Sequence, residues 1–164
     1  MVNGRLVYTD TVMVAGRSKA ALDTSAKKWF SNYFKYQRAD TLAKDKDAAS
    51  SVLGQAAVIF RMTTTSGSLV KYDFFLVMSI KINCSENGYR YKIFDIFFVP
   101  KSGLFRSVGV YQTSPEYLIG LLQKKHLGLG PSINFGRKKI NEYLINTHEP
   151  IAACIASLKK AMAN

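Results

Sequence analysis

The chain is poor in the side chains that most often hold metals or act as catalytic bases. Its 164 residues include 2 cysteines and 2 histidines, too few cysteines for an iron–sulfur framework and without the paired spacing of a zinc finger. The usual candidate bases are His126 and His148, and neither accompanies a nucleophile motif such as Gly-x-Ser-x-Gly. We therefore expect no metal, no cofactor, no catalytic residues and no enzyme activity.

Long apolar runs are also missing. None reaches the roughly 18 residues of a membrane-spanning helix, so no transmembrane segment is expected. Hydrophobic residues nevertheless make up 48% of the chain, which excludes general disorder. A chain of this length can bury about 70% of its unfolded surface, so its core needs no disulfide. Cys84 and Cys154 fall on different predicted elements, and two buried free thiols are favoured over a disulfide.

Acidic residues are few, with 11 Asp and Glu against 23 Lys and Arg, for a net charge of +12. A field of this sign attracts nucleic acids and other anionic partners. The basic residues are spread in pairs and triples, such as Arg137-Lys138-Lys139, and do not form a basic tail. Most of them are interpreted as solvated helix faces.

The N-terminal part of the chain predicts the order β-α-β-β-β. Strands are expected at 5–14, 52–65, 69–84 and 89–99, with a helix from the N-cap Ser18 to about Tyr36 and a loop at 37–51. Gly54 marks a candidate bulge, and Asn87-Gly88 a hairpin. Hairpin-linked strands indicate an α+β fold with an antiparallel sheet of four to five strands and helices on one face.

The C-terminal part of the sequence predicts helices. Ser114 and Pro115 mark the start of one that ends near His126. Pro150 interrupts a second helical stretch, and two helices near 137–147 and 149–162 are expected there. Residues 101–113 are ambiguous and 127–136 form a predicted loop.

These elements predict a fold made of two parts. We expect an α+β domain at 1–113 and a helical extension at 114–164 that packs on the same core.

One face of the sheet is a candidate binding face. Strict alternation places aromatic and basic side chains together on two neighbouring strands, namely Lys81, Arg90, Lys92, Phe75 and Phe94, with Ile96 and Phe98 continuing the row. A patch of this kind is not usually left exposed to solvent in a soluble monomer. Three interpretations stay open: the C-terminal helices cover it, it forms a protein-partner or homodimer interface, or it binds nucleic acid. Asp95, the one acid in its apolar strand, is interpreted as a structural residue with its hydrogen bonds satisfied.

Several motifs resemble a known family. They are Gly16-Arg17-Ser18-Lys19-Ala20-Ala21-Leu22 before a helix with Trp29, a strand glycine at Gly54, and Asn87-Gly88-Tyr89-Arg90-Tyr91-Lys92-Ile93. Over roughly residues 5–100 the chain resembles the uncharacterised family of Bacteroidetes named domain of unknown function four-four-six-eight. The resemblance implies a fold similar to the TATA-binding protein (TBP-like). It implies no catalytic residues, and such a fold does not by itself imply DNA binding.

The resemblance also implies export, because family members usually begin with a signal sequence or lipoprotein leader. Met1-Val2-Asn3-Gly4-Arg5 lacks that pattern. Two localisations therefore stay open: periplasmic or outer-membrane-associated, with the leader absent from this chain, or cytoplasmic. The expected function is a non-enzymatic interaction or binding module of the cell envelope. The alternatives are an intracellular nucleic-acid-binding module that uses the basic, aromatic sheet face, and a small-molecule pocket between sheet and helices.

Overall fold

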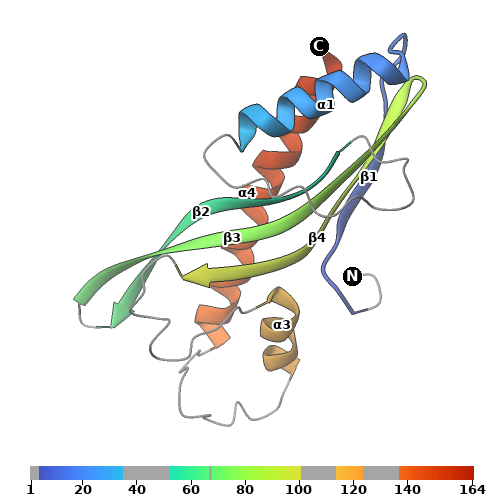
Figure 1. The fold of residues 1–164 in the computed structure, drawn as a ribbon. Helices are drawn as coiled ribbons and strands as arrows, with labels where there is room; N and C mark the ends of the chain where they lie inside the picture. The colour runs from blue at the N-terminus through green and yellow to red at the C-terminus, as the bar shows by residue number, and fades with distance from the viewer. Residues whose placement is uncertain (1–3, 35–51, 67, 101–113, 124–136) are drawn as a thin grey trace. The chain divides into compact units, whose positions relative to one another are not determined.

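A computed structural model describes residues 4–34, 52–66, 68–100, 114–123 and 137–164 (Figure 1). Its elements in chain order are β1 (Tyr8–Met13), α1 (Lys19–Tyr33), β2 (Val52–Ser66), β3 (Ser68–Ser85), β4 (Gly88–Pro100), α3 (Pro115–Gln123) and α4 (Arg137–Ala163). The strands form one four-stranded antiparallel sheet in the order β1-β4-β3-β2. The predicted α+β class is confirmed. The loops expected at 37–51, 101–113 and 127–136 lie outside the described residues.

The chain divides into two compact units. Unit 1 comprises Met1–Ala57, Met78–Asp95 and Ala152–Asn164, and unit 2 comprises Val58–Val77 and Ile96–Ile151. β2, β3, β4 and α4 therefore each contribute residues to both units. The domain boundary expected at residue 113 lies outside the described residues and stays a prediction.

The core of unit 1 begins with one stripe of α1. Ser18 caps this helix by accepting a hydrogen bond from Ala21 N at 3.3 Å, as predicted. The helix buries Leu22, Ala26, Trp29 and Phe30. These positions recur at helical spacing, so they form a single apolar stripe. Trp29 is 5% exposed, which confirms that it is a core residue.

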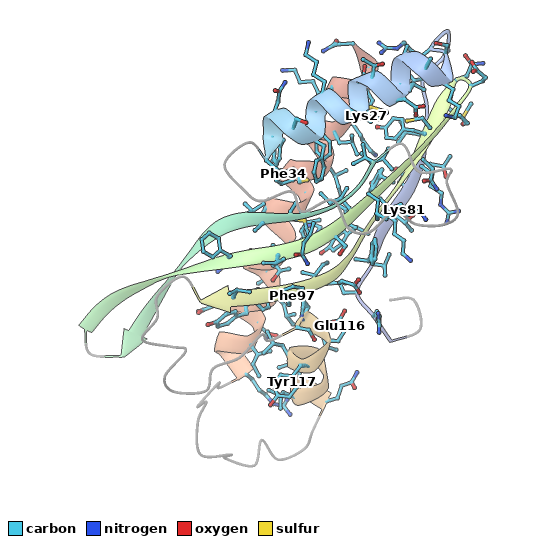
Figure 2. The ribbon with its side chains drawn as sticks, viewed as in Figure 1. Lys27, Phe34, Lys81, Phe97, Glu116 and Tyr117 are labelled. Carbon is cyan, nitrogen blue, oxygen red and sulfur yellow. The ribbon has the colours of Figure 1, made fainter. Side chains whose placement is uncertain are left out.

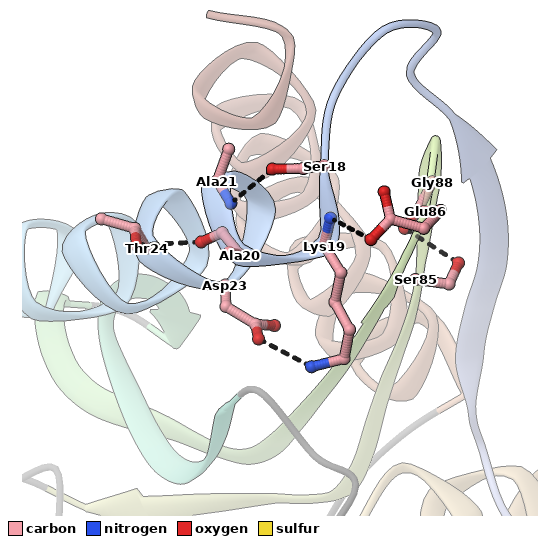
Figure 3. A network of polar contacts seen from close by, with 9 residues as sticks. All are labelled: Ser18, Lys19, Ala20, Ala21, Asp23, Thr24, Ser85, Glu86 and Gly88. Atoms are coloured by element: carbon pink, nitrogen blue, oxygen red, sulfur yellow. Dashed lines mark hydrogen bonds and ion pairs between the residues drawn. The ribbon is translucent and has the colours of Figure 1, made fainter.

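The hairpin turn between β3 and β4 is fastened to the loop between β1 and α1. Asn87 donates its N–H to Arg17 O at 2.9 Å, and its carbonyl accepts from Val14 N at 2.8 Å. Its side-chain Oδ1 accepts from Gly16 N at 3.0 Å. Glu86 Oε1 accepts from Lys19 N at the start of α1, at 3.1 Å (Figure 3). We call these four bonds the turn clasp. The predicted hairpin is confirmed, and Asn87 takes a φ of 59°.

β4 changes its buried face part-way along. Tyr89, Tyr91 and Ile93 are buried, whereas farther along Ile96 and Phe98 are buried. Asp95 lies between the two sets with a φ of 49°. A left-handed residue interrupts the regular extended conformation of a strand, as residues in some β-bulges do. The strict alternation of buried and exposed residues expected through 89–99 therefore does not hold beyond Ile93, because Ile96 and Phe98 are buried.

Unit 2 has its own core. Phe98 of β4 packs edge-on against Tyr143 of α4, with ring centroids 5.5 Å apart. Leu118 of α3 and Ile140 of α4 are buried as well. Ser114 accepts from Tyr117 N at 3.2 Å, which confirms that it is the N-cap of α3.

The C-terminal stretch is one helix, and the expectation of two was wrong. α4 runs from Arg137 to Ala163 with Pro150 inside it. A proline removes one helical N–H and crowds the carbonyl four residues earlier, at a cost of about 3 kcal/mol. Buried side chains follow the helix on both sides of the proline, from Ile140 and Tyr143 to Cys154 and Leu158. Their burial offsets that cost, so the helix continues through Pro150.

Gly54 is expected to be intolerant of a side chain. A Cβ at this position of β2 would collide with the Phe30 ring of α1, which is 8% exposed and has little room to turn. We expect Gly54→Ala to lower the free energy of unfolding by about 1–3 kcal/mol, measured by urea denaturation. In a Phe30→Leu background the same substitution should cost less. Equal losses in both backgrounds would contradict the contact.

The turn clasp predicts a difference between two substitutions of Asn87. Asn87→Gly loses only the side-chain bond to Gly16 and should cost about 1 kcal/mol. Asn87→Ala also places a Cβ in the left-handed region and should cost about 1–2 kcal/mol more. Chemical denaturation of the two variants measures this. Equal stability of the two would show that the turn leaves the left-handed conformation at no cost.

Candidate binding face of the sheet

One face of the unit 1 sheet is covered by helices. Residues paired across an antiparallel ladder share a face, and the β1–β4 register pairs Asp10 with Tyr91 and Val12 with Tyr89. Lys159 of α4 donates to Asp10 Oδ2 at 2.9 Å, and its Nζ lies 6.0 Å from the Tyr91 ring centroid. The last turns of α4 therefore lie on the face that carries Tyr89 and Tyr91.

The opposite face carries the candidate residues. The register pairs Thr9 with Lys92 and Thr11 with Arg90, and all four are exposed. On β3, Lys81 and Asn83 alternate with the buried Ile80 and Ile82 and are half-buried (Figure 2 labels Lys81). We use the name open face for the residues of unit 1 on this side, which are Thr9, Thr11, Met13, Lys81, Asn83, Arg90, Lys92 and Phe94.

The structure brings together four of the five residues selected from the sequence. Arg90, Lys92, Lys81 and Phe94 all belong to unit 1, and Lys92 Nζ lies 5.0 Å from the centroid of the Phe94 ring. That distance allows a cation–π contact. Phe75 is half-buried and belongs to unit 2, so it is not counted in the open face.

Sequence reasoning missed the contribution of β1. Thr9, Thr11 and Met13 share the open face through their pairing with β4, and Met13 is 74% exposed. Thr9 and Thr11 alternate with Tyr8 and Val12, but Asp10 and Met13 break the division into a polar and an apolar face. The pairing itself was not readable, because β1 joins β4 and not the next strand in the chain.

Asp95 has a partner, as expected. Its Oδ1 lies 3.2 Å from Arg5 Nη1, and the two side chains are 43% and 74% exposed. An ion pair this exposed contributes at most about 1 kcal/mol.

The two cysteines lie in the buried part of the described structure. Cys84 and Cys154 are buried free thiols, as predicted, and burial raises the pKa of Cys154 to about 12. At neutral pH it is a protonated thiol, not a nucleophilic thiolate. Among the described residues, no three His, Cys, Asp or Glu side chains gather as they would around a metal ion. No helix in the described part of the chain combines the length and hydropathy needed to cross a membrane.

Comparison with known proteins identifies the family. The model of the family described as "Domain of unknown function (DUF4468) with TBP-like fold" matches residues 8–98, which is more than half of the chain. The chain belongs to the DUF4468 family. The matched region extends from the first residue of β1 almost to the end of β4, so it contains the whole open face. The family resemblance seen in the sequence is confirmed.

Two solved structures share the fold. A DUF4468 family protein from Bacteroides ovatus has a TM-score of 0.70 at 13% identity, covering 100% of this chain and 90% of that one. A TBP-like protein from Parabacteroides distasonis has a TM-score of 0.59 at 15% identity, covering 97% of this chain and 96% of that one. At these identities the likeness shows the fold alone. No curated protein matches the chain.

The ion pair between Asp10 and Lys159 of α4 predicts a pH dependence. The hydrogen bond from Lys159 lowers the pKa of Asp10, and the bond to Asp10 raises the pKa of Lys159. The carboxylate's contribution to stability is present above its unfolded pKa near 3.8 and lost as the pH falls through the lower folded value. The ammonium's contribution is present below 10.5 and lost as the pH rises through the higher folded value.

The test compares the unfolding free energies of the wild type and Asp10→Asn across pH. We expect a difference that is constant from about pH 5 to 9 and shrinks outside that window. A difference that persists unchanged to about pH 2 would contradict a role for the charge of Asp10.

Proposed function

We propose that this DUF4468 protein is a non-enzymatic binding module that docks an acidic protein partner on its open face. The observation that carries the proposal is the positive charge of the open face. Arg90 and Lys92 are exposed on the open face beside Lys81, and the open face as defined contains no acidic side chain. A surface of one sign selects partners of the other sign and repels its own.

The same charge argues against a homodimer through this face. Two copies would bring Arg90 and Lys92 against their own counterparts, and like charges across an interface are destabilising. The protein as a whole carries a net charge of +12, which adds to the repulsion. An acidic segment of another protein gains from the same field.

Nucleic acid is the second candidate. Exposed cations beside an aromatic ring are the features that single-stranded binders use, and Lys92 lies over Phe94 in this way. Phe94 is half-buried, whereas a platform on which bases stack needs an accessible ring face. This favours the acidic protein partner over nucleic acid. The two candidates can be separated in one titration.

We further infer that the protein works in the cell envelope. The inference rests on the export that the family resemblance implies. Fractionation of native cells with mass spectrometry of the mature N-terminus tests it. A processed protein in the envelope is expected, and an unprocessed cytoplasmic protein would contradict export and favour the nucleic-acid alternative.

The binding test uses the full chain with a labelled polyglutamate peptide and a labelled single-stranded oligonucleotide. We expect the peptide to bind, and its affinity to fall steeply between about 50 and 300 mM salt. Replacing both Arg90 and Lys92 by Gln should weaken peptide binding at least about fivefold at the lower salt concentration.

The matched control replaces Lys27 and Lys160 by Gln. Both are exposed lysines of the helices α1 and α4, so the change in net charge is nearly identical while the open face is intact. Equal weakening by the two double variants would show a response to net charge alone and contradict the proposal. Tighter binding of the oligonucleotide than of the peptide would establish the second candidate instead.

A further inference from the structure

A groove of about 480 Å³ lies between α1 and the last turns of α4, entirely within unit 1. Its size is within the range of small-molecule sites. The lining residues recur at helical spacing: Ser25, Lys28, Trp29, Asn32 and Tyr33 on α1, Ser157 and Ala161 on α4, and Asn164 directly after α4. Small side chains on α4, Ser157 and Ala161, leave the space that larger ones would fill.

Two serine hydroxyl groups in the lining can each donate a hydrogen bond to a ligand. Ser157 Oγ accepts a hydrogen bond from Trp29 Nε1 at 3.1 Å. Ser25 Oγ accepts from Arg17 Nη2 at 2.8 Å. A hydroxyl has one proton and two lone pairs. Each serine therefore uses a lone pair within the protein and keeps its proton for another acceptor.

The rest of the polar lining is exposed and carries a single charge. Lys28, Asn32 and Asn164 are exposed, and none of them makes a hydrogen bond or ion pair within the described part of the chain. An amide both donates and accepts, whereas an ammonium only donates. No carboxylate side chain is among the lining residues, and Lys28 is their only charged side chain.

Tyr33 adds an aromatic wall. Its ring stacks on Trp29 with centroids 5.6 Å apart and planes 27° apart, and the residue is 38% exposed. Burial raises the pKa of its hydroxyl, so the phenol is a neutral donor and acceptor at physiological pH. The wall therefore offers an apolar surface with a polar tip.

We propose that this groove binds a small, hydroxyl-rich molecule with one negatively charged group, namely a sugar that bears a carboxylate or a phosphate. Neutral amides and hydroxyls match the hydroxyls of a sugar, and Lys28 matches one oxyanion. An apolar ligand would leave the amides unpaired when it displaced water. This site is separate from the open face, so a failure of either proposal leaves the other untouched.

The only tryptophan of the chain, Trp29, reports on this groove through its indole N–H. The test follows that signal by NMR on the full chain during titration with glucuronic acid, a glucose phosphate, glucose and inorganic phosphate. We expect saturable shifts with one or both charged sugars, at a Kd of roughly 1 mM for ligands of this size. The two charged sugars distinguish a carboxylate from a phosphate ligand.

Matched variants locate the binding. Lys28→Gln should lower the affinity for the charged sugar about tenfold, because it removes a charge-assisted hydrogen bond. Lys27→Gln removes the neighbouring exposed charge that does not line the groove and should leave the Kd unchanged. Ala161→Leu should abolish binding by filling the space.

Three results would overturn the proposal. One is the absence of a saturable shift with either charged sugar up to about 10 mM, ten times the expected Kd. Another is binding of glucose or inorganic phosphate as tight as that of the charged sugars. The third is an equal loss of affinity in Lys27→Gln and Lys28→Gln.

Discussion

The turn clasp is the constraint on which unit 1 depends. Four hydrogen bonds join Glu86 and Asn87 to the loop between β1 and α1. They place β1 beside β4 in one register, since Met13 pairs with Gly88 directly after the turn. They also fix the start of α1 through Lys19 N, so the helix leaves the strand toward one side of the sheet. The side of the sheet that α1 covers is therefore set by residues near the start of the chain.

That difference carries through to the chemistry of each face. On the covered face, α1 contributes Leu22 and Ala26 to the core, and Lys159 ties the end of α4 to Asp10. The opposite side exposes Arg90 and Lys92, because β-strand residues alternate between faces. The same packing of α1 against α4 leaves a groove where the α4 side chains are small. One arrangement of helices on a sheet thus supplies both candidate sites.

Much of this was predictable because it is local. Alternation through β3, the cap at Ser18 and the Asn87-Gly88 turn each depend on neighbouring residues. The missing parts are set by contacts between distant residues. The pairing of β1 with β4 joins segments about eighty residues apart, and α4 passes through Pro150 because of burial on both sides. The left-handed conformation of Asp95 also has no signal in the neighbouring residues of the sequence. For the candidate site, Lys81, Arg90, Lys92 and Phe94 were found from alternation, whereas Thr9 and Thr11 needed the strand order.

The central claim is that the open face, and not the helical side, receives an acidic partner. Amide chemical shifts of the full chain during titration with polyglutamate test this most directly. The account predicts that shifts concentrate at Thr9, Thr11, Arg90 and Lys92, with little change along the exposed side of α1 around Lys27. Shifts that centre on α1, or that spread evenly over every exposed lysine, would contradict it.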